Sequence, residues 1–108
     1  MSNYMKVIEY YGEDVLDTEV SAFETVEALH QRSWLEKNLH NLTQEELLAL
    51  HLNDLKLLAN VEKMVQHLRK AYNFSLSKEP TGEWWWHLDK IADGTLKVSY
   101  QIEVERND

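Results

Sequence analysis

The sequence contains no cysteine, which excludes disulfide bonds and thiolate ligands for a metal. It has one proline and three glycines in 108 residues, and no glycine-rich phosphate-binding loop. It also lacks a run of roughly 18 to 20 uncharged apolar residues, the length that a membrane span needs. The first residues do not have the charged-then-apolar layout of a signal peptide. We therefore expect a cytoplasmic protein without membrane contacts.

Positive charge is scarce. Nineteen acidic side chains outnumber eleven Lys and Arg, for a formal net charge of −8. This field repels phosphate backbones, which proteins normally bind through cationic side chains, so direct nucleic-acid binding is disfavoured. A protein partner with a basic surface fits better, although excess carboxylate also simply keeps a small domain soluble. The length and a 44% hydrophobic composition predict a single domain over residues 1–108.

The first predicted helix covers about residues 19–39, where apolar residues recur at three- and four-residue steps. Ser21 and Glu24 have the spacing of a capping box near its start. Asp17 or Thr18 could cap the same helix equally well. The start is therefore less certain than the helix itself.

A second helix begins at a clear capping box, Thr43 with Glu46. Its apolar pattern continues as far as Tyr72. One helix of this length would be ~45 Å long, beyond the core of so small a domain. Either it breaks near Asn53 or Asn60, or its free part packs on a second copy. The homodimer reading uses a stripe with heptad spacing that includes Leu50, Leu57 and Met64.

The residues that follow Tyr72 have an alternating apolar pattern, which predicts strands. Two three-residue loops that end in glycine, residues 80–82 and 92–94, suit hairpin turns. Taking both as hairpins fixes one register for three strands, with an almost wholly apolar face. A helix over residues 83–92 is the competing interpretation, because short apolar runs are ambiguous by periodicity.

With a further strand over Tyr4 to Tyr11, the order of elements is strand, helix, helix, strand, strand, strand. We expect an α+β fold in which an antiparallel-rich sheet has both helices packed on one face.

The other face of that sheet supplies the candidate site. Trp85 would project from it with His87 beside it, and Gln101 and Glu103 would follow on a neighbouring strand. Tryptophan is strongly enriched at binding hot spots, so these four residues are the predicted partner-binding site. The alternative is that another segment covers Trp85 and makes it a core residue.

The sequence gives little support for catalysis or for metal binding. Glu27 and His30 have a spacing that metal ligands use on a helix, but the second motif of a carboxylate-bridged site is missing. No nucleophile elbow or paired catalytic carboxylates stand out. We predict no catalytic residues, no metal site and no cofactor.

Size and charge together favour a small acidic protein-binding module that acts by occlusion. Inhibitors or regulators of nucleic-acid-handling proteins fit this outline, including anti-CRISPR proteins, antitoxins and immunity proteins. The alternative is a small-molecule or catalytic site in a pocket lined by the four Trp and five Tyr side chains.

Overall fold

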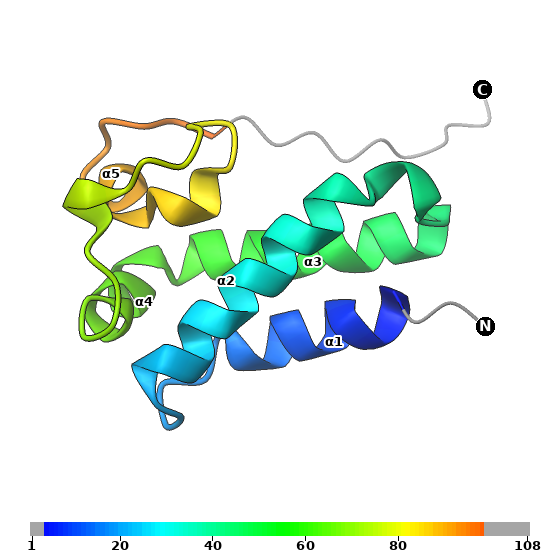
Figure 1. Cartoon of the computed structure of the whole chain (residues 1–108), viewed down its shortest axis with the longest axis horizontal. Helices are drawn as coiled ribbons and strands as arrows, with labels where there is room; N and C mark the ends of the chain where they lie inside the picture. The colour runs from blue at the N-terminus through cyan, green and yellow to red at the C-terminus, as the bar shows by residue number, and fades with distance from the viewer. Residues whose placement is uncertain (1–3, 99–108) are drawn as a thin grey trace.

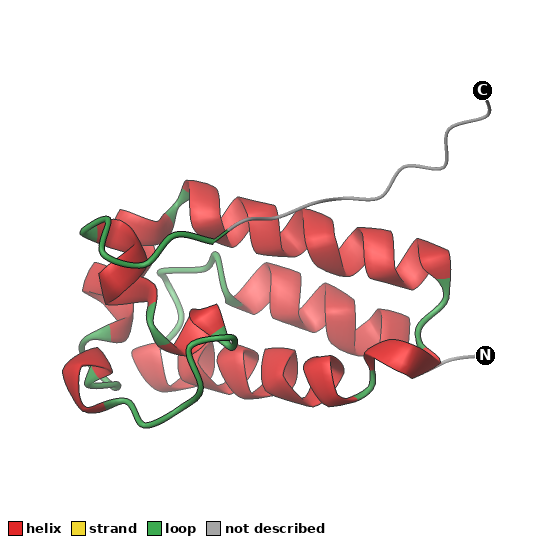
Figure 2. Ribbon diagram, turned by 90° about the horizontal axis from the view of Figure 1, so that it is seen from above, coloured by secondary structure: helices red, strands yellow, loops and turns green. Residues whose placement is uncertain are grey.

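The computed structural model describes residues 4–98, and all regular structure within this range is helical (Figures 1 and 2). The predicted α+β fold with an antiparallel sheet is therefore wrong. The elements are, in order, α1 (Tyr4–Asp14), α2 (Ala22–Lys37), the 3₁₀ turn η1 (Leu39–Asn41), α3 (Gln44–Ala59), α4 (Val61–Leu68), the 3₁₀ turns η2 (Phe74–Leu76) and η3 (Trp84–Trp86), and α5 (Leu88–Ala92).

The predicted first strand is helix α1. Its tyrosines and β-branched residues favour a strand locally, but Ile8, Tyr11 and Val15 also recur at helical spacing. All three side chains are fully buried. The helix is preferred because this spacing places them on one face against the other helices.

The helix starts predicted from capping residues are confirmed. The Ser21 hydroxyl accepts a hydrogen bond from the Glu24 N–H at the start of α2, which decides between the candidate caps. At the start of α3, Thr43 and Glu46 form both hydrogen bonds of a capping box, 3.1 Å and 2.8 Å long. The long apolar segment breaks at Asn60, which ends α3 and precedes α4.

The two predicted hairpins are absent from the described residues. The Trp84–Trp86 segment forms a 3₁₀ turn and α5 follows it, which is closer to the competing helical interpretation. Gly94 does adopt the left-handed backbone expected of a turn glycine, with φ +85°, but it follows the end of a helix. A left-handed glycine terminates helices as readily as it closes hairpins, so this signal fitted both folds.

The helices α1, α2 and α3 form an up-down-up bundle. Figure 1 shows that α1 and α3 run in the same direction and that α2, which connects them along the chain, runs in the opposite direction. Helix α1 packs against both α2 and α3, while α4, α5, η2 and η3 pack together at one end; η1 joins α2 to α3 at the other end. One hydrophobic core joins the two parts; it contains Leu50, Leu57 and Met64, all fully buried. The heptad stripe assigned to a homodimer therefore faces the core of its own chain.

Candidate functional site

Trp85, the centre of the predicted binding site, is buried, with 1% of its surface exposed. Its indole N–H donates a 2.8 Å hydrogen bond to the hydroxyl of Ser33 on α2. The neighbouring Trp86 donates to the same oxygen at 2.8 Å. The guanidinium of Arg32 lies 4.3 Å from the centroid of the Trp85 ring, within range of a cation–π interaction. Trp85 thus ties the C-terminal part of the described chain to α2.

His87 is also buried, and its Nε2 lies 2.7 Å from the carbonyl oxygen of Glu79. The surface that was expected to present Trp85 and His87 together is therefore not formed. Gln101 and Glu103, the other two predicted site residues, lie outside the described residues.

A polar cluster lies in the middle of the helical bundle. Asp54 of α3 is fully buried and accepts hydrogen bonds from Arg32 Nε and Nη2, both 2.9 Å long. The hydroxyl of Tyr11 donates to the same carboxylate at 2.5 Å. Burial of the guanidinium lowers the pKa of Arg32, but attraction to Asp54 and the hydrogen bonds between them outweigh this, so that pKa is raised above its ordinary value. This buried ion pair and the Tyr11 hydroxyl connect α1, α2 and α3. Because the cluster is closed to solvent, its role is structural and it does not offer a ligand site.

No group of three or more His, Asp or Glu side chains within residues 4–98 has the arrangement of a metal site. None of the helices in this range is both long enough and apolar enough to cross a membrane.

The negative charge of the protein is concentrated in one segment. Residues 7–31 contain seven carboxylates and no Lys or Arg, which leaves twelve acidic and eleven basic residues in the rest of the chain. Five of the seven are exposed and two are partly exposed. Within residues 4–98 none of the seven takes part in a salt bridge. The seven are Glu9, Glu13, Asp14, Asp17, Glu19, Glu24 and Glu27.

This segment forms a corner of the molecule, where α1 turns into α2 (Figure 1). Phe23, the second residue of α2, lies within it and is 71% exposed. We call the seven carboxylates together with Phe23 the acidic corner. An exposed aromatic ring in a segment whose carboxylates form no salt bridge with another described residue has the composition of a contact surface for a cationic partner.

The acidic corner was missed because the sequence was interpreted through its net charge and through its tryptophans. The signal that could have found it is the distribution of charge along the chain, since a run of 25 residues without a cation is visible in the sequence. The exposure of Phe23 could not have been found in this way. Its spacing from other apolar residues of the helix is the same as that of residues such as Leu29 that are buried, so the pattern predicts burial for both.

Two open depressions of the surface are lined by residues other than the tryptophans. One, of about 350 Å³, is lined by residues 59–63 at the junction of α3 and α4. The other, of about 370 Å³, is a groove between α1 and α3. It is lined by Met5, Ile8, Glu9, Gly12 and Glu13 of α1 and by Ala49, Leu52, Asn53 and Lys56 of α3. Neither is lined by an aromatic residue.

Comparison with known proteins gives no further assignment. No family model matches the sequence, and no curated protein or solved structure is significantly similar to it.

Proposed function

We propose that this protein is a binding module that covers a basic surface on a partner protein and thereby inhibits or regulates it. A partner that handles nucleic acid is the natural target, because its working surface is cationic. The observation that carries the proposal is the acidic corner, with seven carboxylates, no cation among them and an exposed phenylalanine.

Charge and ring have different roles in this proposal. Uncompensated carboxylates raise the rate of encounter with a cationic surface, and salt screens this attraction. Affinity at short range comes mostly from a few well-packed anchor residues, and aromatic rings supply large contact areas. Phe23 is the anchor, since 71% of its surface is available for burial.

The acidic corner replaces the predicted contact through Trp85 and His87, which are buried in the single chain. The alternative of a ligand pocket lined by Trp and Tyr has less support than the acidic corner, since Trp84, Trp85 and Trp86 are buried in the hydrophobic core. The proposal places the protein in the cytoplasm with its partner, and cell fractionation tests that location.

The test is affinity capture from lysate of the source cells at low and moderate salt, read by mass spectrometry. The wild-type protein is compared with Phe23→Ser and with the control Leu76→Ser, because Leu76 is 72% exposed and lies on η2. We expect one stoichiometric partner with a basic surface, lost with Phe23→Ser, weakened at higher salt and retained by the control. Equal capture by both variants, or no salt-sensitive partner at all, would contradict the proposal.

A further inference from the structure

Helix α3 has a second apolar face that the fold leaves uncovered. Leu48, Leu52 and Leu55 follow each other at steps of four and three residues, so they lie on one side of the helix. They are 47%, 46% and 36% exposed, whereas Leu50 and Leu57 on the opposite side are fully buried. We call these three residues the leucine ridge. Three large side chains exposed in a row indicate a contact surface rather than chance exposure.

We propose that the leucine ridge pairs with the ridge of a second copy of the chain, with the two α3 helices antiparallel. The ridge has a spacing of four and then three residues, and in a helix of opposite direction the order becomes three and then four. The leucines of two antiparallel ridges can therefore interdigitate about a two-fold axis near Leu52. The ridge and the acidic corner use different residues, although Glu9 and Glu13 of the corner line the same groove as Leu52 of the ridge.

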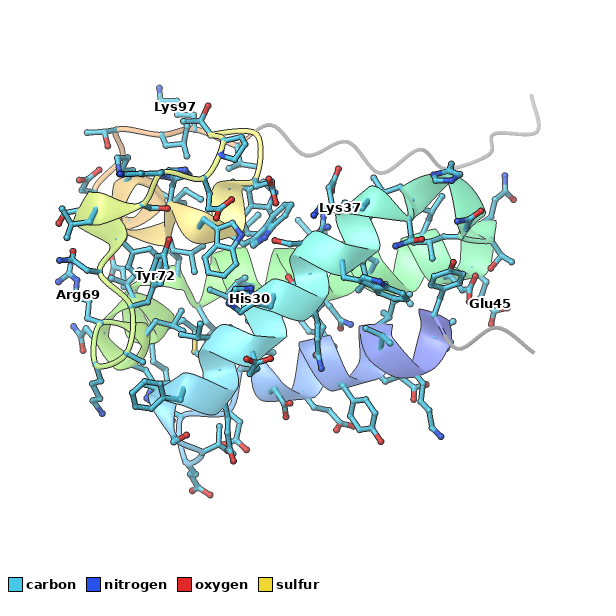
Figure 3. The ribbon with its side chains drawn as sticks, viewed as in Figure 1. His30, Lys37, Glu45, Arg69, Tyr72 and Lys97 are labelled. Carbon is cyan, nitrogen blue, oxygen red and sulfur yellow. The ribbon has the colours of Figure 1, made fainter. Side chains whose placement is uncertain are left out.

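Charges beside the ridge favour the antiparallel arrangement. Lys56 lines the side of α3 that faces α1, and Glu45 lies eleven residues earlier, about three helical turns, and so on the same side. Figure 3 shows Glu45 near the N-terminal end of α3. In an antiparallel pair, Glu45 of each copy approaches Lys56 of the other. A parallel pair would instead put both Glu45 side chains at one end and both Lys56 side chains at the other, so that neither would meet an opposite charge.

The position of the acidic corner supports the same arrangement. Because α1 and α3 run in the same direction, the corner lies towards the C-terminal end of α3 (Figure 1). An antiparallel pair therefore places the two acidic corners at opposite ends, where their repulsion is smallest, whereas a parallel pair places them side by side.

The dimer is expected to be weak. A helix of 16 residues is ~24 Å long, and one face of it falls short of the ~800 Å² per partner of a standard interface. We expect dissociation constants in the micromolar range or above, so that the oligomeric state changes with concentration.

The first experiment is sedimentation velocity of the purified full chain over a wide concentration range. Leu52→Glu places a charge at the two-fold axis and should weaken dimerisation at least about tenfold. The matched control is Leu76→Glu, which adds the same charge at an exposed leucine outside the ridge and should dimerise as the wild type does. Circular dichroism confirms that each variant is folded.

The second experiment tests the direction of the helices by charge exchange. Glu45→Lys and Lys56→Glu should each weaken self-association, because each places like charges at both ends of the pair. Mixing the two variants should restore a dimer that contains one copy of each. A wild-type chain that stays monomeric at all concentrations, as it would if another protein or the chain's own remaining residues covered the ridge, overturns the proposal. Equal effects of Leu52→Glu and Leu76→Glu, or a mixture that stays monomeric, also overturn it.

Discussion

Replacing Asp54 with alanine should destabilise the protein more than any other single carboxylate substitution in the described chain. The carboxylate is fully buried and accepts two hydrogen bonds from Arg32 and one from Tyr11. Its removal leaves a guanidinium with 3% exposure beside the indole of Trp85 and without its main counter-charge. Breaking a buried pair in this way costs about 3–5 kcal/mol, a large share of the ~5–15 kcal/mol that stabilises a typical domain.

Equilibrium urea unfolding, followed by tryptophan fluorescence, measures this cost. With a slope of about 1.5–2 kcal/mol per molar urea, the midpoint of Asp54→Ala should fall by roughly 2 M. Glu36→Ala is the control, because Glu36 pairs with the same Arg32 from a side chain that is 39% exposed. Its loss should cost at most about 0.5 kcal/mol.

A double substitution refines the argument. Arg32→Met with Asp54→Leu removes both charges and should recover much of the stability lost in Asp54→Ala, since an apolar pair needs no desolvated ions. A cost below about 1 kcal/mol for Asp54→Ala would refute the reasoning. So would a double variant less stable than Asp54→Ala.

Three further predictions concern single contacts. Gly12→Ala should lower stability by about 1–3 kcal/mol in thermal unfolding, because its Cβ would lie 2.5 Å from the side chain of Asn53; unchanged stability would show that Asn53 yields freely. Ser33→Ala removes the acceptor of two buried indole N–H groups and should cost about 2 kcal/mol in urea unfolding, whereas a cost near zero would show that the indoles find other acceptors. Hydrogen bonds from Thr95 lower the pKa of Asp93 below its ordinary 3.8, so the stabilisation by the ionised carboxyl is present above pH 3.8 and is lost as the pH falls through the lower folded-state pKa. Thr95→Val should raise that pKa in an NMR titration, and an unchanged value would assign the shift to another cause.

The parts of the fold that the sequence predicts correctly are those set by local interactions. Ser21 and the pair Thr43 and Glu46 satisfy N–H groups within one turn of their own helix, so local spacing indicates where a helix begins. It was sufficient for Thr43, whereas the structure was needed to choose Ser21 over Asp17 and Thr18. Length alone indicated that the long helix breaks near Asn53 or Asn60 or packs on a second copy, and the structure places the break at Asn60.

The prediction of a sheet was wrong because the local sequence pattern favours strands, whereas contacts with distant parts of the chain stabilise another conformation. The register of the three strands was internally consistent, but consistency among side chains of one segment does not show that the strands form. Trp85 and Trp86 instead donate to Ser33, more than 50 residues away, and no pattern within residues 74–102 contains that acceptor. For the same reason, the burial of Trp85 could not be predicted, while the acidic run in residues 7–31 could have been.

The most direct test of the proposed function is the association rate with the captured partner, measured for two triple variants of equal net charge. One neutralises the acidic corner through Glu19→Gln, Glu24→Gln and Glu27→Gln, and the other neutralises carboxylates elsewhere through Glu62→Gln, Glu79→Gln and Glu83→Gln. We predict that the corner variant associates at least about tenfold more slowly at low salt, and that the control remains close to the wild type. Equal rates for the two variants would contradict the assignment of the binding surface to the acidic corner.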